Sequence, residues 1–155
     1  MRQELQNLIQ SLRNELMAFA EMSIQLDRHF QFLTHPADGV NSETSNNVQI
    51  KARSVRRALK ERTLAQMAIA RVLQLEADAT MESIIAELPT ANRSLVIALV
   101  RAVRELRTMM WLTFRRNLLS IRHATTEARH FLNHILPSHF KVIPPRLCQS
   151  LFLFR

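Results

Sequence analysis

Apolar residues in the first 33 positions recur at alternating steps of four and three, interrupted only by Ser23, which places them along one side of an α-helix. This line contains Leu5, Ile9, Leu12, Leu16, Phe19, Leu26, Phe30 and Leu33. A second line lies between residues 92 and 136 and contains Val96, Leu99, Val103, Leu106, Met110, Phe114, Asn117, Ile121, Ala124, Ala128, Phe131 and Ile135. Because a long helix can bury such a line only against other helices, the pattern predicts a helical bundle.

Breaks in the pattern predict where the helices begin and end. The segment 34–47, "THPADGVNSETSNN", holds a proline and the only glycine and is predicted to be a loop. A second long helix is predicted from Val48 to Leu75, with its most enclosed part from Leu64 onward. The stretch "MESIIAELP" predicts a short helix, and Pro89 precedes the third long helix.

The predicted fold class is all-α: an elongated antiparallel bundle or coiled coil of three long helices plus one short helix. Residues 1–136 are expected to form the bundle domain. Pro144 and Pro145 exclude a continuous helix after that point, so residues 137–155 are expected to form an irregular, apolar C-terminal tail. The third helix is longer than the first, and this surplus length also allows a homodimer.

The composition excludes several classes of protein. A single cysteine, Cys148, permits neither an internal disulfide nor a multi-cysteine zinc cluster, as in proteins of a reducing compartment. The start "MRQELQNLIQ" is too polar for a signal peptide, and "LVIALV" at 95–100 is too short to cross a membrane. No glycine-rich phosphate loop or catalytic set is recognisable. We therefore expect a cytoplasmic protein that is not an enzyme, with no catalytic residues, no cofactor and no membrane insertion.

A formal net charge of +8 raises the alternative that this is a basic helical bundle that binds nucleic acid. In the run "KARSVRRALKER" at 51–62, Arg53, Arg57 and Lys60 fall on one side of the predicted helix and could contact phosphates. The run has no interleaved aromatic residues, and a solvated helix face has the same composition. We do not expect nucleic acid as the main partner.

Four potential metal ligands, His123, Glu127, His130 and His134, follow one another at steps of four, three and four. On a helix they would lie on one side, pointing away from the apolar line. A di-metal bundle needs a second Glu-x-x-His pair, and "EARH" occurs only once. We therefore predict no metal site, although two histidines one turn apart can bind nickel or zinc weakly.

Asn117 interrupts the apolar line of the third helix between Phe114 and Ile121. A buried amide needs a hydrogen-bond partner, and such residues often set the register between helices. The sequence equally allows an asparagine at the edge of the helix in contact with water.

The order of elements is similar to that of the FlgN-like flagellar export chaperones. The resemblance rests on "LQNLIQSLRNEL" at 5–16, "KERTLAQMAIARVL" at 60–73, "TMESIIAELP" at 80–89 and "LRTMMWLTFRRNLLSI" at 106–121, where Asn117 corresponds to the family's asparagine near the middle of the third helix. The resemblance implies a cytoplasmic chaperone that binds amphipathic helical segments of flagellar hook-associated proteins before type III export. It implies that the cargo is bound by the end of the third helix and the segment after it.

The pattern of the residues also favours recognition of a partner helix in a groove. The apolar end "LFLFR" either folds back on the bundle or stays available to a partner. The partner-binding residues that the resemblance implies are Asn117, Phe131, Leu132, Ile135, Leu136, Leu151, Phe152 and Phe154.

Overall fold

The computed structural model describes the backbone of residues 1–34 and 42–135, and the side chains of residues 1–34 and 45–127. Within these ranges the chain is all-α, which confirms the predicted fold class. Three helices are long, α1 (Arg2–Thr34), α2 (Ser42–Val72) and α4 (Thr90–Ile135), and α3 (Met81–Glu87) is short. None of the helices in the described ranges combines the length and apolar character required to span a membrane.

The chain divides into two compact units, residues 1–120 and 121–155, and α4 contributes to both. The predicted division into a bundle (1–136) and an irregular tail (137–155) stays a prediction, because residues 136–155 lie outside the described ranges. All helix packing discussed below lies within the first unit.

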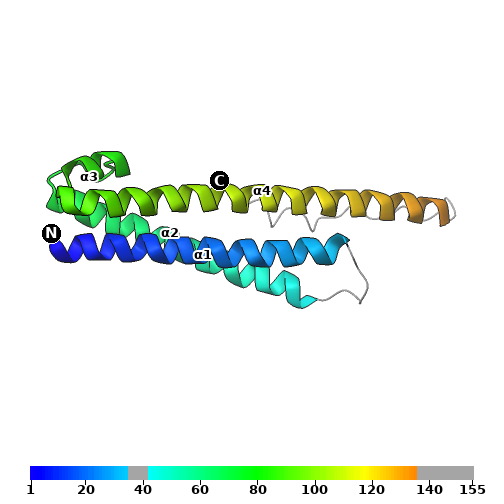
Figure 1. Cartoon of the computed structure of the whole chain (residues 1–155). Helices are drawn as coiled ribbons and strands as arrows, with labels where there is room; N and C mark the ends of the chain where they lie inside the picture. Colours follow the sequence, from blue (N-terminus) through cyan, green and yellow to red (C-terminus); the bar gives the residue numbers. More distant parts are fainter. Residues whose placement is uncertain (35–41, 136–155) are drawn as a thin grey trace. The chain divides into compact units, whose positions relative to one another are not determined.

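Contacts between the helices show that α2 runs antiparallel to α1, whereas α4 runs parallel to α1 (Figure 1). Along α1, Glu15 and Glu21 pair with Arg62 and Lys51 of α2, so the two sequences run in opposite directions. Further along α1, Asp27 pairs with Arg116 of α4, whose guanidinium also lies 4.0 Å from the centre of the Phe30 ring. The short helix α3 lies between α2 and α4 in the sequence, where the chain reverses direction.

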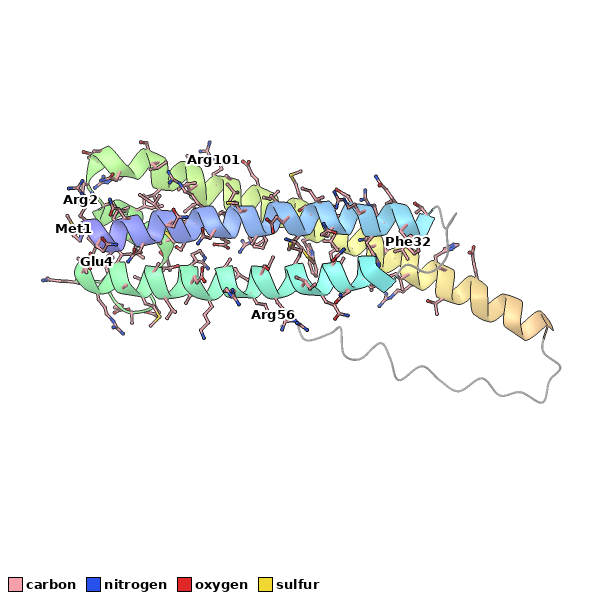
Figure 2. The ribbon with its side chains drawn as sticks, turned by 90° about the horizontal axis from the view of Figure 1, so that it is seen from below. Met1, Arg2, Glu4, Phe32, Arg56 and Arg101 are labelled. Carbon is pink, nitrogen blue, oxygen red and sulfur yellow. The ribbon has the colours of Figure 1, made fainter. Side chains whose placement is uncertain are left out.

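The core of the first unit is apolar and draws on all four helices. Its fully or almost fully buried side chains include Leu8, Leu12, Phe19, Leu26, Ile69, Ile84, Leu88 and Val96. Burial of each large apolar side chain stabilises the fold by roughly 1.5–3 kcal/mol relative to leaving it exposed. Many basic side chains point outward instead, such as Arg56 on α2 and Arg101 on α4 (Figure 2).

The buried face of α1 differs from the predicted apolar line. Leu8 and Glu15 are buried, whereas their neighbours Ile9 and Leu16, which the prediction placed on the line, are half-buried. The reason is that α1 contacts both α2 and α4, so it buries a wider face than the single seam of a two-stranded coiled coil. The line predicted for α4 is confirmed as far as Ile121, since each of its side chains from Val96 is buried or half-buried. Its next residue, Ala124, is exposed, so the prediction is wrong at that position.

Two predictions about α2 were wrong. The helix begins at Ser42, six residues earlier than predicted, because the serine, threonine and asparagine residues before Val48 are tolerated in the first turns of a helix, although they also favour turns. The end of α2 is also less enclosed than predicted: Ile69 and Ala70 are buried, but Leu64 and Val72 are exposed.

Local hydrogen bonds explain the reversal between α2 and α4. Gln74 has a φ of 58°, the left-handed conformation that often ends a helix. Thr80 begins α3 as its N-cap, since its Oγ1 accepts a hydrogen bond of 3.2 Å from the backbone N–H of Ser83. Arg93 in the first turns of α4 donates to the carbonyl oxygens of Ala86 and Leu88, each at 2.6 Å, and so connects α4 to the end of α3.

Candidate functional site

Asn117 is buried in the first unit, where its side chain is 3% exposed. Its Nδ2 donates a hydrogen bond of 2.7 Å to the carbonyl oxygen of Leu26 on α1. The interpretation of Asn117 as an exposed helix-edge residue is therefore wrong. The hydrogen bond supports the alternative, in which Asn117 sets the register of α4 against α1. Its assignment to partner binding stays a prediction, but in this structure the side-chain amide forms a hydrogen bond within the bundle.

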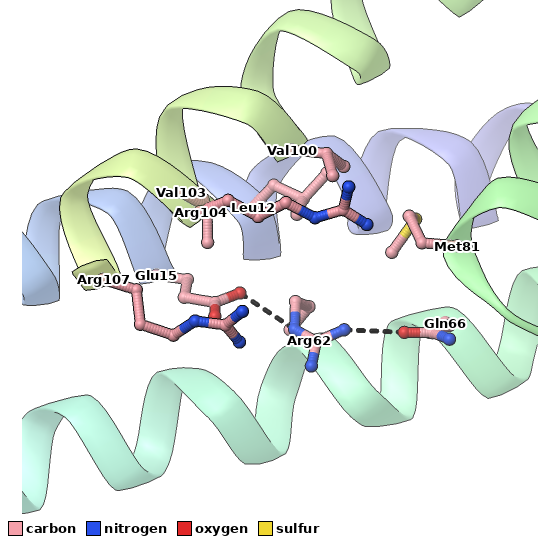
Figure 3. Close-up of a pocket in the computed structure, with 9 residues that line it drawn as sticks. All are labelled: Leu12, Glu15, Arg62, Gln66, Met81, Val100, Val103, Arg104 and Arg107. Atoms are coloured by element: carbon pink, nitrogen blue, oxygen red, sulfur yellow. Dashed lines mark hydrogen bonds and ion pairs between the residues drawn. The ribbon is translucent and has the colours of Figure 1, made fainter.

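A charged cluster that the sequence analysis missed lies at the contact between α1, α2 and α4 (Figure 3). Glu15 is 1% exposed, and its Oε2 lies 2.9 Å from Nε of Arg62, an ion-pair distance without the alignment of a hydrogen bond. Arg62 also donates a hydrogen bond of 2.6 Å to Oε1 of Gln66. Burial raises the pKa of the Glu15 carboxyl, while the positive charges of Arg62 and Arg107 partly oppose this rise.

The same cluster lines a cavity of about 270 Å³. Its polar wall consists of Glu15, Arg62, Gln66, Arg104 and Arg107, and its apolar wall includes Leu12 and Met81. The sequence did carry a signal for Glu15: it lies seven residues after Leu8 and four before Phe19, so it occupies the buried side of α1. Its acidic character conceals this signal, because glutamate is almost never fully buried unless it is paired.

The outward side of α4 carries exposed apolar residues over positions 109–119. Met109, Leu112 and Leu119 are each about 60% exposed and are spaced three and seven residues apart, so they lie on one side of the helix. We call these three residues the outer stripe. Trp111 is 52% exposed beside it, and its ring stacks on that of Phe114 at a centroid distance of 5.6 Å. An apolar surface of this kind is a common feature of protein interaction sites.

The outer stripe is bordered by positive charge. Exposed arginines of α4 in the first unit are Arg101, Arg104, Arg107, Arg115 and Arg116, of which Arg104 and Arg116 pair with Glu82 and Asp27. Among exposed acidic residues of the same helix, Glu105 and Glu127 are the two described. A partner with an apolar stripe and acidic flanks would therefore complement this side of α4.

The structure describes the side chains of only two of the four potential metal ligands found in the sequence. His123 and Glu127 are exposed, as predicted, and Nδ1 of His123 lies 3.2 Å from Oε1 of Glu127. The side chains of His130 and His134 lie outside the described ranges. Across the side chains that the structure does describe, there is no group of three or more His, Cys, Asp or Glu residues placed to hold a metal ion.

Most of the predicted partner-binding residues also fall outside the described side chains. Phe131, Leu132 and Ile135 belong to α4 by backbone alone, and Leu136, Leu151, Phe152 and Phe154 are not described. Their role stays a prediction. By contrast, the three basic residues proposed for phosphate contacts, Arg53, Arg57 and Lys60, are exposed on α2 as predicted.

Comparisons of this chain with protein-family models, with curated proteins and with solved structures found no match.

Proposed function

We propose that this chain is a non-enzymatic, cytoplasmic chaperone or adaptor that holds an amphipathic helical segment of a partner protein. The observation that carries the proposal is the outer stripe of α4, in which Met109, Leu112 and Leu119 are exposed to solvent on one side of the same helix. Three large side chains at helical spacing suit the apolar side of another helix. Trp111 beside them supplies a large aromatic contact surface of the type that dominates binding energy.

The border of arginines specifies the chemistry of the partner. A bound helix with acidic residues next to its apolar stripe would place carboxylates near Arg101 or Arg115. Such charges guide association and select among partners more than they add affinity. The proposed mechanism is sequestration, in which the apolar stripe of the partner stays covered until it is released.

The similarity to FlgN-like chaperones in sequence pattern narrows the proposal to flagellar type III export, with hook-associated proteins as the partners. Long apolar lines on the helices and the asparagine in the middle of α4 support this assignment. In such a role the end of α4 and the C-terminal residues would also take part in binding, as the resemblance implies.

The proposal is tested by affinity purification of the full chain from its native cells, followed by mass spectrometry. The variant Leu112→Glu/Leu119→Glu places charges in the outer stripe. Met17→Glu is the control for an added surface charge, because Met17 is 63% exposed on α1 and is not part of the stripe. We expect hook-associated proteins with the wild type and the control but not with the double variant.

Two outcomes of this experiment would contradict the proposal. Recovery of no secreted filament component would remove the export role, and equal recovery by the double variant would remove the outer stripe as the binding surface. Circular dichroism of each variant establishes that its helices are intact.

Nucleic-acid binding is the second candidate, because Arg53, Arg57 and Lys60 are exposed on α2. It predicts retention on DNA or RNA that weakens steeply with salt, in proportion to the number of phosphate contacts. Triple substitution of these residues by glutamine would abolish that retention and leave recovery of a partner protein unchanged. If the wild type is not retained at low salt, this candidate is eliminated.

A further inference from the structure

The cavity between α1, α2 and α4 has an excess of positive charge on its wall. Three guanidinium groups line it, from Arg62, Arg104 and Arg107, against the single carboxylate of Glu15 (Figure 3). Glu82 pairs with Arg104 but does not line the cavity. Positive charge in a partly enclosed space with low-dielectric walls attracts an anion more strongly than the same charge on an open surface.

The guanidinium of Arg62 is held in place before any ligand binds. Its NH1 donates to Gln66, its Nε faces Glu15, and the amide of Gln66 in turn donates a hydrogen bond of 2.8 Å to the carbonyl oxygen of Ala79. This chain of contacts links α2 to the segment before α3. Arg62 therefore loses little conformational freedom when a ligand accepts a hydrogen bond from it, and such preorganisation increases affinity.

Arg107 faces the cavity from α4, and its charge is close enough to attract the Glu15 carboxylate. Glu15 itself is 1% exposed, and its Oε2 has no aligned hydrogen-bond donor among the described residues. The cavity is thus lined by Arg62, which pairs with the buried Glu15 carboxylate, by Arg107, and by Arg104, which pairs with Glu82. This arrangement leaves the donor groups of Arg107, and those of Arg104 that do not face Glu82, available for a second acceptor.

We propose that this cavity binds a small oxyanion of the size of phosphate, with Arg104 and Arg107 as its main ligands and Arg62 as a positioned third. Guanidinium groups match the oxygen atoms of such anions through paired N–H donors. The volume of about 270 Å³ is more than enough to admit such an ion. The site is separate from the outer stripe and needs no partner helix.

The proposal predicts opposite effects of substitutions at Glu15 and at Arg107 on the affinity for an oxyanion. A bound oxyanion lies near the Glu15 carboxylate, and two like charges in a confined space repel each other. Glu15→Gln removes that repulsion and preserves the size of the side chain. This variant should therefore bind an oxyanion more tightly than the wild type, whereas Arg107→Gln should bind it more weakly.

The test measures thermal unfolding of the full chain against inorganic phosphate concentration, with sodium chloride at matched ionic strength as the reference. Phosphate stabilises proteins in general, so only differences between variants count. We expect a saturable rise of the midpoint in the wild type. Arg107→Gln should weaken the apparent affinity by roughly tenfold or more, the loss typical of a charge-assisted hydrogen bond.

Arg101→Gln is the control for charge alone, because Arg101 is exposed on the same helix but does not line the cavity. It should respond to phosphate as the wild type does. The proposal is overturned if Arg107→Gln and Arg101→Gln respond equally, or if Glu15→Gln does not increase the phosphate response. Arg104→Gln replaces Arg107→Gln if that variant fails to fold.

Discussion

The side-chain amide of Asn117 on α4 donates a hydrogen bond of 2.7 Å to the backbone carbonyl oxygen of Leu26 on α1. Both residues are buried, and the nearby pair of Arg116 with Asp27 repeats the same register between the two helices. Because a backbone carbonyl cannot move independently of its helix, this bond specifies how far α4 lies along α1. A shift of one turn would leave the buried amide without a partner.

We expect Asn117→Asp to destabilise the first unit more than Asn117→Ala does. The aspartate replaces the donor by an acceptor and buries a charge without a counterion, a change that typically costs about 3–5 kcal/mol. Alanine removes one hydrogen bond and a small volume, for a loss of roughly 1–2 kcal/mol. Urea unfolding at neutral pH measures both, and equal losses would contradict the buried role of the amide.

The stability of the bundle should carry a contribution from Glu15 that is lost as the pH rises. Burial raises the pKa of its carboxyl in the folded state, although Arg62 and Arg107 oppose the rise and Arg104 lines the same cavity. A raised folded-state pKa means that folding favours the protonated form. This stabilisation is fully present below the unfolded pKa of about 4.3 and is lost as the pH rises through the raised value.

Glu15→Gln isolates this contribution from that of the other acidic groups. The pKa of Glu82, for example, is lowered by its hydrogen bond with Arg104, so it contributes stability that is lost as the pH falls. The difference in unfolding free energy between the wild type and Glu15→Gln should change in favour of the wild type on acidification. A difference that does not vary with pH would show that Glu15 is not perturbed.

Truncation of Leu8 should destabilise the first unit strongly, whereas truncation of Met17 should not. Leu8 is 0% exposed, so Leu8→Ala should cost about 2–5 kcal/mol through lost burial and a residual cavity. Met17 is 63% exposed on the same helix, and Met17→Ala should change stability by no more than about 0.5 kcal/mol. Denaturant unfolding of both variants tests the register of α1, because the predicted line ran through Ile9 and not through Leu8.

Trp111 should report on the outer stripe, because it is the only tryptophan and is 52% exposed. In the free protein, iodide should quench its fluorescence readily, helped by the exposed Arg115 next to it along the helix. A partner helix bound along the outer stripe should reduce the quenching and shift the emission to shorter wavelength. Weak quenching of the free protein would mean that this side of α4 is already covered in solution.

The number, order and kind of helices followed from the sequence alone. Runs of apolar residues at steps of three and four strongly favour long helices in a chain with a single glycine. Pro89 predicts the boundary between the short helix and the third long helix. The apolar line of α4 could be read correctly because one broad side of the helix is buried along the part of α4 within the first unit. The exposed histidine and glutamate at 123 and 127 followed from the same geometry.

Only the tertiary structure decided what the polar residues do. Periodicity could place Asn117 on the apolar line, but the acceptor of its hydrogen bond belongs to a residue 91 positions away. Glu15 and the three arginines of the cavity come from helices whose relative register is determined by packing, and local propensity carries no information about it. For the same reason the width of the buried face of α1 could not be known in advance: it depends on how many neighbours a helix has, and that is a property of the assembled bundle.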